Sequence, residues 1–526
     1  MISLVLAIAL QAAPVAAGPV VQPPKGFDAH VEQLRRKVGA PGLSIAIVDE
    51  GQTVLAKGWG VRRLGGSEKV DADTLFMTGS TGKAVTTAAL ATLVDAGKLS
   101  WDDKVADRLP GFQMYDPWVT REMTVRDLLV HRSGLGLGQG DLLFVPRSNI
   151  PRAEAVRRLR YLKPVTSFRS GYAYDNILYM VAGQLIEAIS GQTWEDYVRE
   201  HVFAAAGMTT ATTDGRRFDV ANRAQPHARM NGGLRGAGDQ EVLDERDELA
   251  TSAAPAGGMA ISANDMAKWL KLQLAHGRLP GGGRLFSEAQ HDAMWEPTVI
   301  QPIDKVPPGM EVTKPTFQAY ALGWEIQDYR GTQIVWHGGA VFGFKTVVVL
   351  IPSRNAGFSI ELNSEDGELP RGLMYELLDH YLGLQPQPWT ERYIAYKQQL
   401  IAGALKGLDG VQAKPAAVGP SLPTAKYAGT YSDPWYGDIA VTQTPGEGGL
   451  RIDFKSTPRM AGKLEHWQYD TFVTRFDDKT LEPAYVTFGL NAEGGVERVT
   501  MKAVSPIADF SWDYHDLLFT PKSGGQ

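Results

Sequence analysis

Two short apolar runs, far apart in the chain, place the strongest constraint on its fold. Residues 43–48 read Leu-Ser-Ile-Ala-Ile-Val, and residues 346–351 read Thr-Val-Val-Val-Leu-Ile. Runs of this length that are rich in β-branched residues are typical of buried strands, whereas the long segment between them carries helical patterns. We therefore expect an α+β domain over residues 18–405 whose sheet takes strands from both ends of the segment.

The chain changes character near residue 405. Residues 406–424 are rich in Gly and Pro and poor in periodicity, which predicts a linker. Residues 425–526 then carry short alternating runs separated by turn residues, a pattern that favours a small antiparallel β-barrel. These runs are 429–431, 438–441, 450–454, 484–488 and 498–501.

The first 17 residues predict export. Residues 4–10 form an apolar run, and the small residues Ala-Ala-Pro-Val-Ala-Ala-Gly follow at 12–18. This is the pattern of a secretory signal peptide, so we expect residues 1–17 to be removed after Ala17 and the mature protein to be periplasmic or secreted, without a stable membrane span. The alternative interpretation is a short helix lying in the membrane surface, because the run is too short to cross a bilayer.

Charge and cysteine content exclude several classes of protein. The 53 Lys and Arg residues are outnumbered by 59 Asp and Glu residues, which leaves no basic excess for a nucleic-acid partner. The chain has no cysteine, which removes disulfides, thiolate metal sites and cysteine nucleophiles. Its 10 histidines form no His-Glu-x-x-His motif and no close pair on one predicted helical face, so we expect no metal and no other cofactor.

The first candidate for catalysis is a Ser-x-x-Lys motif. Ser80 precedes a predicted helix, so it lies where unpaired N–H groups and the helix dipole favour developing negative charge. Lys83 follows three residues later and falls on the same face. A serine hydroxyl is a weak nucleophile and needs a neighbour that accepts its proton, a role that a desolvated lysine can fill. The motif alone is weak evidence, because about one match is expected by chance in a chain of this length.

Further motifs follow Ser80 in a characteristic order. In type, order and spacing, the segment from about residue 41 to residue 363 resembles the class C β-lactamase and penicillin-binding-protein-like serine hydrolases, a family that includes D-aminopeptidases and secreted esterases. The matching motifs are Phe-Met-Thr-Gly-Ser-Thr-Gly-Lys at 76–83, the structural signature at 123–135, Tyr-x-Asn at 174–176, Pro-Ala-Gly-Gly-Met at 255–259, Tyr-Ala-Leu-Gly-Trp at 320–324, and His-Gly-Gly at 337–339.

This resemblance implies a β-lactamase/transpeptidase-like fold and a covalent mechanism. The fold would be an antiparallel sheet flanked by helices, together with an all-helical part. Ser80 would attack the substrate carbonyl and become acylated, while Lys83 and Tyr174 share its proton. Tyr174, anionic or poised beside Lys83, would be the general base and later the general acid, because a cationic neighbour lowers the pKa of a tyrosine from about 10.

The resemblance also assigns substrate-binding roles. Asn176 would bond the substrate amide or hold Lys83, and the N–H groups of Ala340 and Ser80 would form the oxyanion hole. His337, Gly338 and Gly339 lie where β-lactamases carry Lys-Thr-Gly. A histidine there removes a permanent positive charge, which argues against recognition of a penicillin carboxylate and favours peptides, amides or esters.

Other residues near these motifs have simpler interpretations. We expect His131 to cap or pack a helix end, and Tyr172 to be a neighbour of the base rather than the base itself. His227 either lines the pocket or is an ordinary loop histidine. The glycine-rich residues 134–140 predict a mobile loop beside the site, and Lys522 lies in a frayed terminus.

The last hundred residues resemble the lipocalin-like module that follows some hydrolases of this family. The resemblance lies in Tyr-Ala-Gly-Thr-Tyr at 427–431, residues 464–472 and Val-Thr-Phe at 486–488. Relatives use such a module to cover the hydrolase cleft or to form oligomers. We therefore expect the barrel to narrow access to Ser80, and a homo-oligomer is a further expectation.

Together these features predict an exported serine hydrolase. We expect it to cleave peptide or amide bonds, with D-residue peptides among its candidate substrates, through an acyl-enzyme on Ser80. A carboxylesterase is the near alternative, and a β-lactamase or a non-catalytic penicillin-binding scaffold is the remote one. Because a scaffold has no physical need for Ser80, Lys83 and Tyr174 together, the trio favours an enzyme.

Overall fold

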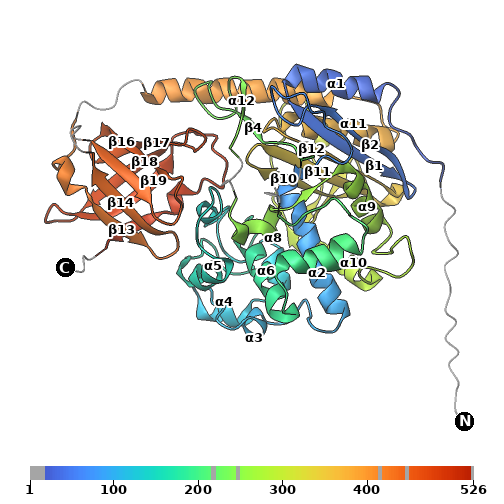
Figure 1. Cartoon of the computed structure of the whole chain (residues 1–526), viewed down its shortest axis with the longest axis horizontal. Coiled ribbons are helices and arrows are strands. Elements are labelled where there is room, and N and C mark those ends of the chain that lie inside the picture. The colour runs from blue at the N-terminus through green and yellow to red at the C-terminus, as the bar shows by residue number, and fades with distance from the viewer. Residues whose placement is uncertain (1–17, 215–220, 245–248, 413–417, 445–448, 523–526) are drawn as a thin grey trace, which may run out of the picture.

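An eight-stranded antiparallel sheet lies at the centre of the first domain (Figure 1). The computed structural model describes residues 18–214, 221–244, 249–412, 418–444 and 449–522, so the expected signal peptide lies outside the described residues. Strands β1 and β12 are neighbours, paired from Leu43↔Leu362 to Asp49↔Ala356, which confirms a sheet built from both ends of the segment. Its order is β2 (Gln52–Gly60), β1 (Gly42–Asp49), β12 (Ala356–Leu362), β11 (Phe344–Ile351), β10 (Thr332–Val341), β9 (Glu325–Tyr329), β8 (Gln318–Tyr320) and β7 (Val299–Ile300).

Both faces of this sheet are covered, which explains why β1 is apolar along its whole length. Ile45 and Ile47 belong to a core shared with α1 (Phe27–Val38) and α11 (Glu368–Tyr381). The alternate residues Ala46 and Val48 face the opposite core, which includes α9 (Ala263–Leu274). Successive side chains of a strand point to opposite faces, so a strand covered on both sides needs apolar residues at every position.

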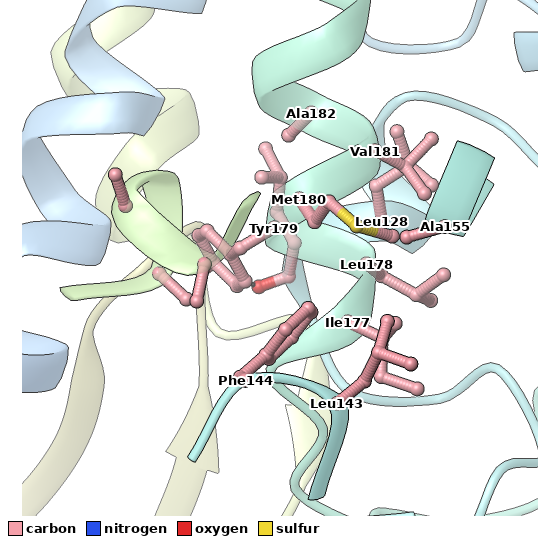
Figure 2. Packing of buried hydrophobic residues seen from close by; sticks show 14 of the residues in the cluster. Leu128, Leu143, Phe144, Ala155, Ile177, Leu178, Tyr179, Met180, Val181 and Ala182 are labelled. Atoms are coloured by element: carbon pink, nitrogen blue, oxygen red, sulfur yellow. Dashed lines mark hydrogen bonds between the residues drawn. The ribbon is translucent and has the colours of Figure 1, made fainter. Parts of the chain in front are cut away.

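The all-helical part packs around one largely buried, predominantly apolar helix, α6 (Ile177–Ser190), which ends at Gly191 in a left-handed conformation with φ of 75°. Figure 2 shows Leu143 and Phe144 against the first turn of α6, next to Ile177. Each such side chain contributes about 1.5–3 kcal/mol when it is fully buried. The other helices are α2 (Lys83–Asp95), α3 (Val105–Arg108), α4 (Pro117–Glu122), α5 (Arg152–Arg158), α7 (Trp194–Val198), α8 (Ala254–Gly257) and α10 (Glu288–Trp295). Two short strand pairs, β3 (Phe76–Met77) with β6 (Ala260–Ile261) and β4 (His227–Arg229) with β5 (Gln240–Val242), complete the domain.

The second domain is a closed eight-stranded antiparallel barrel, as the alternating runs predict (Figure 1). Pairing of the first strand with the last closes it, with Tyr431 opposite Pro521 and Ser432 opposite Thr520. Its strands are β13 (Gly429–Asp433), β14 (Gly437–Gln443), β15 (Leu450–Phe454), β16 (Ala461–Gln468), β17 (Thr471–Phe476), β18 (Ala484–Leu490), β19 (Val496–Ala503) and β20 (Leu518–Pro521).

A long helix crosses from the hydrolase domain toward the barrel. Helix α12 spans Trp389–Gln412 and runs along one edge of the molecule in Figure 1. The predicted linker at 406–424 is therefore helical over its first residues, because Leu408 and Ala404 pack against Leu234 and Ala237 and stabilise this end of the helix. Among the described residues, no helix is both long and apolar enough to span a membrane.

The two domains share one continuous apolar core. Trp435 of the barrel is buried, and its indole N–H donates to the carbonyl of Gly140 at 3.3 Å. On the other side of the junction, the rings of Phe342 and Trp512 stack with their centroids 5.2 Å apart. The barrel is thus packed against the hydrolase domain at the end where the catalytic motifs lie.

Candidate active site

Three backbone segments meet around Ser80, and a glycine on each allows the close approach. Ser80 lies in a 3₁₀ turn, Gly79–Gly82, that leads into α2. A Cβ at Gly79, where φ is 52°, would lie 2.6 Å from the Ala340 nitrogen, and one at Gly257 would lie 2.6 Å from the Gly79 carbonyl carbon. A Cβ at Gly339 would lie 3.2 Å from the Ser80 nitrogen. The predicted oxyanion donors, Ser80 and Ala340, therefore belong to backbone segments that face each other.

Lys83 is the first residue of α2 and is completely buried. Its ammonium nitrogen lies 3.1 Å from Ser80 Oγ, 2.6 Å from Asn176 Oδ1 and 3.2 Å from the carbonyl oxygen of Ala256. Burial lowers the pKa of Lys83 to about 7, against the opposing effect of nearby carboxylates. A neutral amine has two N–H groups and one lone pair. Asn176 and Ala256 accept the two N–H groups, so the lone pair is left for the hydroxyl of Ser80.

Tyr174 lies beside Lys83, with Nζ 4.8 Å from the centre of its ring. Burial raises the pKa of Tyr174 well above its ordinary value, although the nearby Ser80 side chain acts in the opposite direction. The pKa of the lysine is lowered and that of the tyrosine is raised, so Tyr174 is neutral near pH 7 and Lys83 becomes neutral as the pH rises through about 7. Of the two forms expected for Tyr174, anionic or poised beside Lys83, this favours the poised, protonated tyrosine. The physical reason is desolvation, which disfavours the charged form of each partner.

Asn176 immediately precedes α6. Hydrogen bonds at both the nitrogen and the oxygen of its side-chain amide determine its orientation. Its Nδ2 donates to Asp141 Oδ2 at 2.7 Å, and its Oδ1 accepts from Lys83. Of the two roles expected for Asn176, the structure shows the one in which it holds the lysine.

His337 lines the cavity but has no free ring nitrogen. Its Nδ1 is 2.6 Å from the carbonyl oxygen of Gly338 and must donate to it, so Nε2 accepts the hydrogen bond from the Tyr320 hydroxyl at 2.8 Å. Burial lowers the pKa of His337 to about 3, so the ring is neutral. The expected direct contact of His337 with substrate is therefore revised to a role in shaping the wall of the site.

A cavity of about 570 Å³ opens beside Ser80 and receives residues from both domains. Ser80, Tyr174, Asn176, Gly338, Gly339 and Ala340 all line it, so the predicted site residues come together. Sequence reasoning missed two contributors. The first is Asp141, which directly follows the glycine-rich residues 134–140. Because these residues were interpreted as a mobile loop, the sequence analysis did not consider Asp141 as a site residue. The barrel contributes Glu482, Ser505, Ile507, Ala508, Asp509, Phe510, Ser511 and Trp512, which no motif pointed to.

The barrel holds the segment that was predicted to be a mobile loop. Asp513 accepts hydrogen bonds from the backbone N–H groups of Gly140, at 2.6 Å, and Leu142, at 2.9 Å. A Cβ at Gly138 would lie 2.6 Å from the Phe510 ring. A Cβ at Gly140 would lie 3.0 Å from the indole nitrogen of Trp435, so the barrel approaches closely at these two glycines.

The remaining candidates have structural roles. His131 is buried, with its ring centroid 4.2 Å from that of Tyr174, which fits the expected packing role. His227 is buried and accepts from the Leu64 N–H at 2.9 Å, so it is an ordinary structural histidine. Lys522 pairs with Asp438 at 2.6 Å, away from the cavity.

One side-chain group in the described part of the chain could offer metal ligands, namely His276, His291 and Asp292. None of the three lines the cavity beside Ser80. The two imidazole rings stack, with centroids 4.0 Å apart and planes 22° apart. An imidazole binds a metal in the plane of its ring, so both rings would have to turn before they could share an ion.

Comparison with known proteins agrees with this geometry. Residues 27–383 match the family described as Beta-lactamase, and residues 413–521 match a domain of unknown function, DUF3471. The unguisins hydrolase of Aspergillus campestris is 32% identical over 435 residues, which are 79% of this chain and 77% of that protein. Penicillin-binding protein 4 of Amycolatopsis lactamdurans is 29% identical over 62% of this chain and 80% of its own length.

The fold of both domains recurs in a solved structure. The octameric penicillin-binding protein homologue from Pyrococcus abyssi superposes with a TM-score of 0.60 at 19% identity and covers 91% of this chain and 98% of that one. The family match extends over more than half of the chain and contains Ser80, Lys83, Tyr174 and Asn176. The chain therefore belongs to the beta-lactamase family of serine hydrolases.

Proposed function

We propose that this hydrolase cleaves peptide or amide bonds through an acyl-enzyme on Ser80. The observation that carries the proposal is the surroundings of Lys83, whose Nζ lies 3.1 Å from Ser80 Oγ while Asn176 Oδ1 and the carbonyl oxygen of Ala256 accept two of its N–H groups. Such an amine is a general base within hydrogen-bonding reach of the nucleophile.

In the proposed reaction, Lys83 Nζ accepts the Ser80 proton as Oγ attacks the carbonyl carbon. The N–H groups of Ser80 and Ala340 stabilise the resulting oxyanion. The Tyr174 hydroxyl, which its pKa keeps protonated, donates its proton to the leaving nitrogen and is restored by the proton on Lys83. Water then attacks the acyl-enzyme with Lys83 again as the base, which releases the acid and free Ser80.

The neutral ring of His337 supports a peptide or other open-chain amide rather than a penicillin or cephalosporin as substrate. His337 is neutral where β-lactamases have a lysine, so this position supplies no charge for a β-lactam carboxylate. Among amides, we place peptides with D-residues first, because the motifs resemble a family that includes D-aminopeptidases. We also propose that the protein is exported, on the support of the apolar run and small residues in its first 17 positions.

A labelling experiment tests the proposal directly. A fluorophosphonate probe should acylate wild-type protein on Ser80 and leave Ser80→Ala unlabelled, because the probe needs an activated serine. Turnover is then compared on matched D- and L-residue amides, short-chain esters and a chromogenic cephalosporin. Faster turnover of esters than of every amide would replace the amidase assignment with an esterase, and absence of labelling in folded wild-type protein would overturn the enzyme assignment itself.

A further inference from the structure

A loop of the barrel touches the polar network of the catalytic residues. This loop joins β19 to β20, and its Ser511 Oγ donates to Asp141 Oδ2 at 2.9 Å. The same Asp141 oxygen accepts from Asn176 Nδ2 at 2.7 Å, and Asn176 Oδ1 accepts from Lys83 at 2.6 Å. A continuous series of hydrogen bonds therefore runs from the barrel to the lysine beside Ser80.

The direction of donor and acceptor along this series determines whether Lys83 can accept a proton from Ser80. An asparagine side chain has one acceptor end and one donor end. Because Asp141 accepts from the N–H₂ end of Asn176, the oxygen end must face Lys83. Lys83 then uses one N–H on Asn176 and another on Ala256, and its lone pair faces Ser80. If the amide turned over, two donors would face each other and this arrangement would be lost.

The barrel loop is held firmly enough to fix Ser511. Asp513, two residues on, is buried and accepts from the N–H groups of Gly140 and Leu142, which flank Asp141. The ring of Phe510 packs edge-on against Tyr174 with a centroid separation of 5.9 Å. The loop thus contacts the hydrolase domain on both sides of Ser511.

We propose that Ser511 and Asp141 are positioning residues for the catalytic lysine, so that the barrel completes the active site instead of only covering it. This inference rests on the proposed function, in which Lys83 is the general base. Neither residue touches the reacting atoms. They act through the orientation of Asn176 and through the charge that Asp141 places near Lys83.

The charges around Asp141 and Lys83 define how the rate of Ser80 acylation is expected to depend on pH. Burial raises the pKa of Asp141 to about 7, and the hydrogen bonds from Asn176 and Ser511 act in the opposite direction. The negative charge of Asp141 in turn raises the pKa of Lys83 against the dominant effect of burial. The other titratable groups facing the pair are Asp175 and Asp513 near Asp141, and His131, Tyr174, Tyr179 and His337 near Lys83.

Loss of the Ser511 hydroxyl should therefore change both the rate and its pH dependence. In Ser511→Ala, Asp141 loses a donor, its pKa rises, and its negative charge is lost at higher pH than in the wild type. The pKa of Lys83 then falls, so the acidic limb of the pH profile moves to lower pH. We also expect the plateau rate of Ser80 acylation to fall about three- to tenfold, the range that loss of one hydrogen bond produces.

Two further variants separate charge from hydrogen bonding. Asp141→Asn removes the charge, but its amide oxygen retains an acceptor for both Asn176 and Ser511, so it should move the acidic limb to lower pH with a smaller loss of rate. Ser511→Thr keeps the hydroxyl and should restore the wild-type profile.

The matched control is Ser432→Ala. It removes the 2.7 Å hydrogen bond that Ser432 Oγ donates to Asp438 within the same barrel. Ser432 does not line the cavity. The rate of fluorophosphonate labelling against pH is measured for the full-length variants, with circular dichroism to verify folding. Profiles of Ser511→Ala and Asp141→Asn that coincide with that of Ser432→Ala would overturn the inference while leaving the proposed function intact. A wild type that is not labelled would instead overturn the proposed function.

Discussion

At the scale of single residues, the chemistry of the site depends on desolvation. Lys83, Tyr174 and His337 are named by the sequence motifs, but their protonation states depend on the burial of each side chain. The sequence-based argument left Tyr174 either anionic or poised beside Lys83. Burial favours the neutral form of both side chains, which supports the proposed role of Lys83 as the base.

This assignment predicts a specific pH dependence. Only neutral Lys83 can accept the Ser80 proton, and its pKa lies at about 7. We therefore expect kcat/KM for amide hydrolysis to rise with pH through that region and then level off. Lys83→Arg should lower kcat/KM by about 10²- to 10⁴-fold, because a guanidinium does not deprotonate and general base catalysis is lost. A pH profile that is flat through this region would show that another group is the base.

At the scale of elements, the barrel loop is the least expected part of the site. Alternation of apolar residues predicted five of the eight barrel strands, since that pattern reports the inward and outward faces of each strand, and it missed β16, β17 and β20. Loop contacts have no such periodicity. Nothing in the sequence around Phe510 or Ser511 indicates that these residues meet Tyr174 and Asp141, which are more than 300 positions away. The expectation that the barrel narrows the site is best tested at this loop.

Removal of the whole barrel is a poor test, because it would expose hydrolase core residues such as Leu142, which share one apolar core with the barrel. Phe510 is 39% exposed and lines the cavity, so Phe510→Ala should enlarge the opening without a large loss of stability. We expect the ratio of kcat/KM for bulky over small acyl groups to rise about tenfold. Tyr469→Ala, which truncates an exposed aromatic residue elsewhere on the barrel, is the control. The same size preference in both variants would mean that the loop does not limit access.

At the scale of the whole molecule, the apolar core is continuous across the two domains. Trp435 and Trp512 of the barrel are buried together with hydrolase residues such as Leu142. The hydrolase cavity is completed by a domain that the chain adds only after α12. The working unit is therefore both domains together.

The proposed export also belongs to this scale. Full-length protein expressed in a Gram-negative host should be recovered outside the cytoplasm with Gly18 as its first residue, because the apolar run directs it to the secretion machinery. Leu6→Arg interrupts that run and should leave unprocessed protein in the cytoplasm. Mass spectrometry of the intact chain from each fraction checks both outcomes. Cytoplasmic wild-type protein that still begins at Met1 would contradict the proposal.

The sequence by itself determined the α+β domain with the sheet that joins β1 with β12 and the barrel that follows it, and it named Ser80, Lys83, Tyr174 and Asn176 as the candidates for one site. These features follow from local periodicity and from motifs in which reacting groups are close along the chain or resemble those of a known family. Only the tertiary structure decided the contribution of Asp141 and Ser511, the orientation of the Asn176 amide and the charge of Lys83. Each of these depends on which distant groups exclude water or accept a hydrogen bond, and that information exists only once the chain is folded.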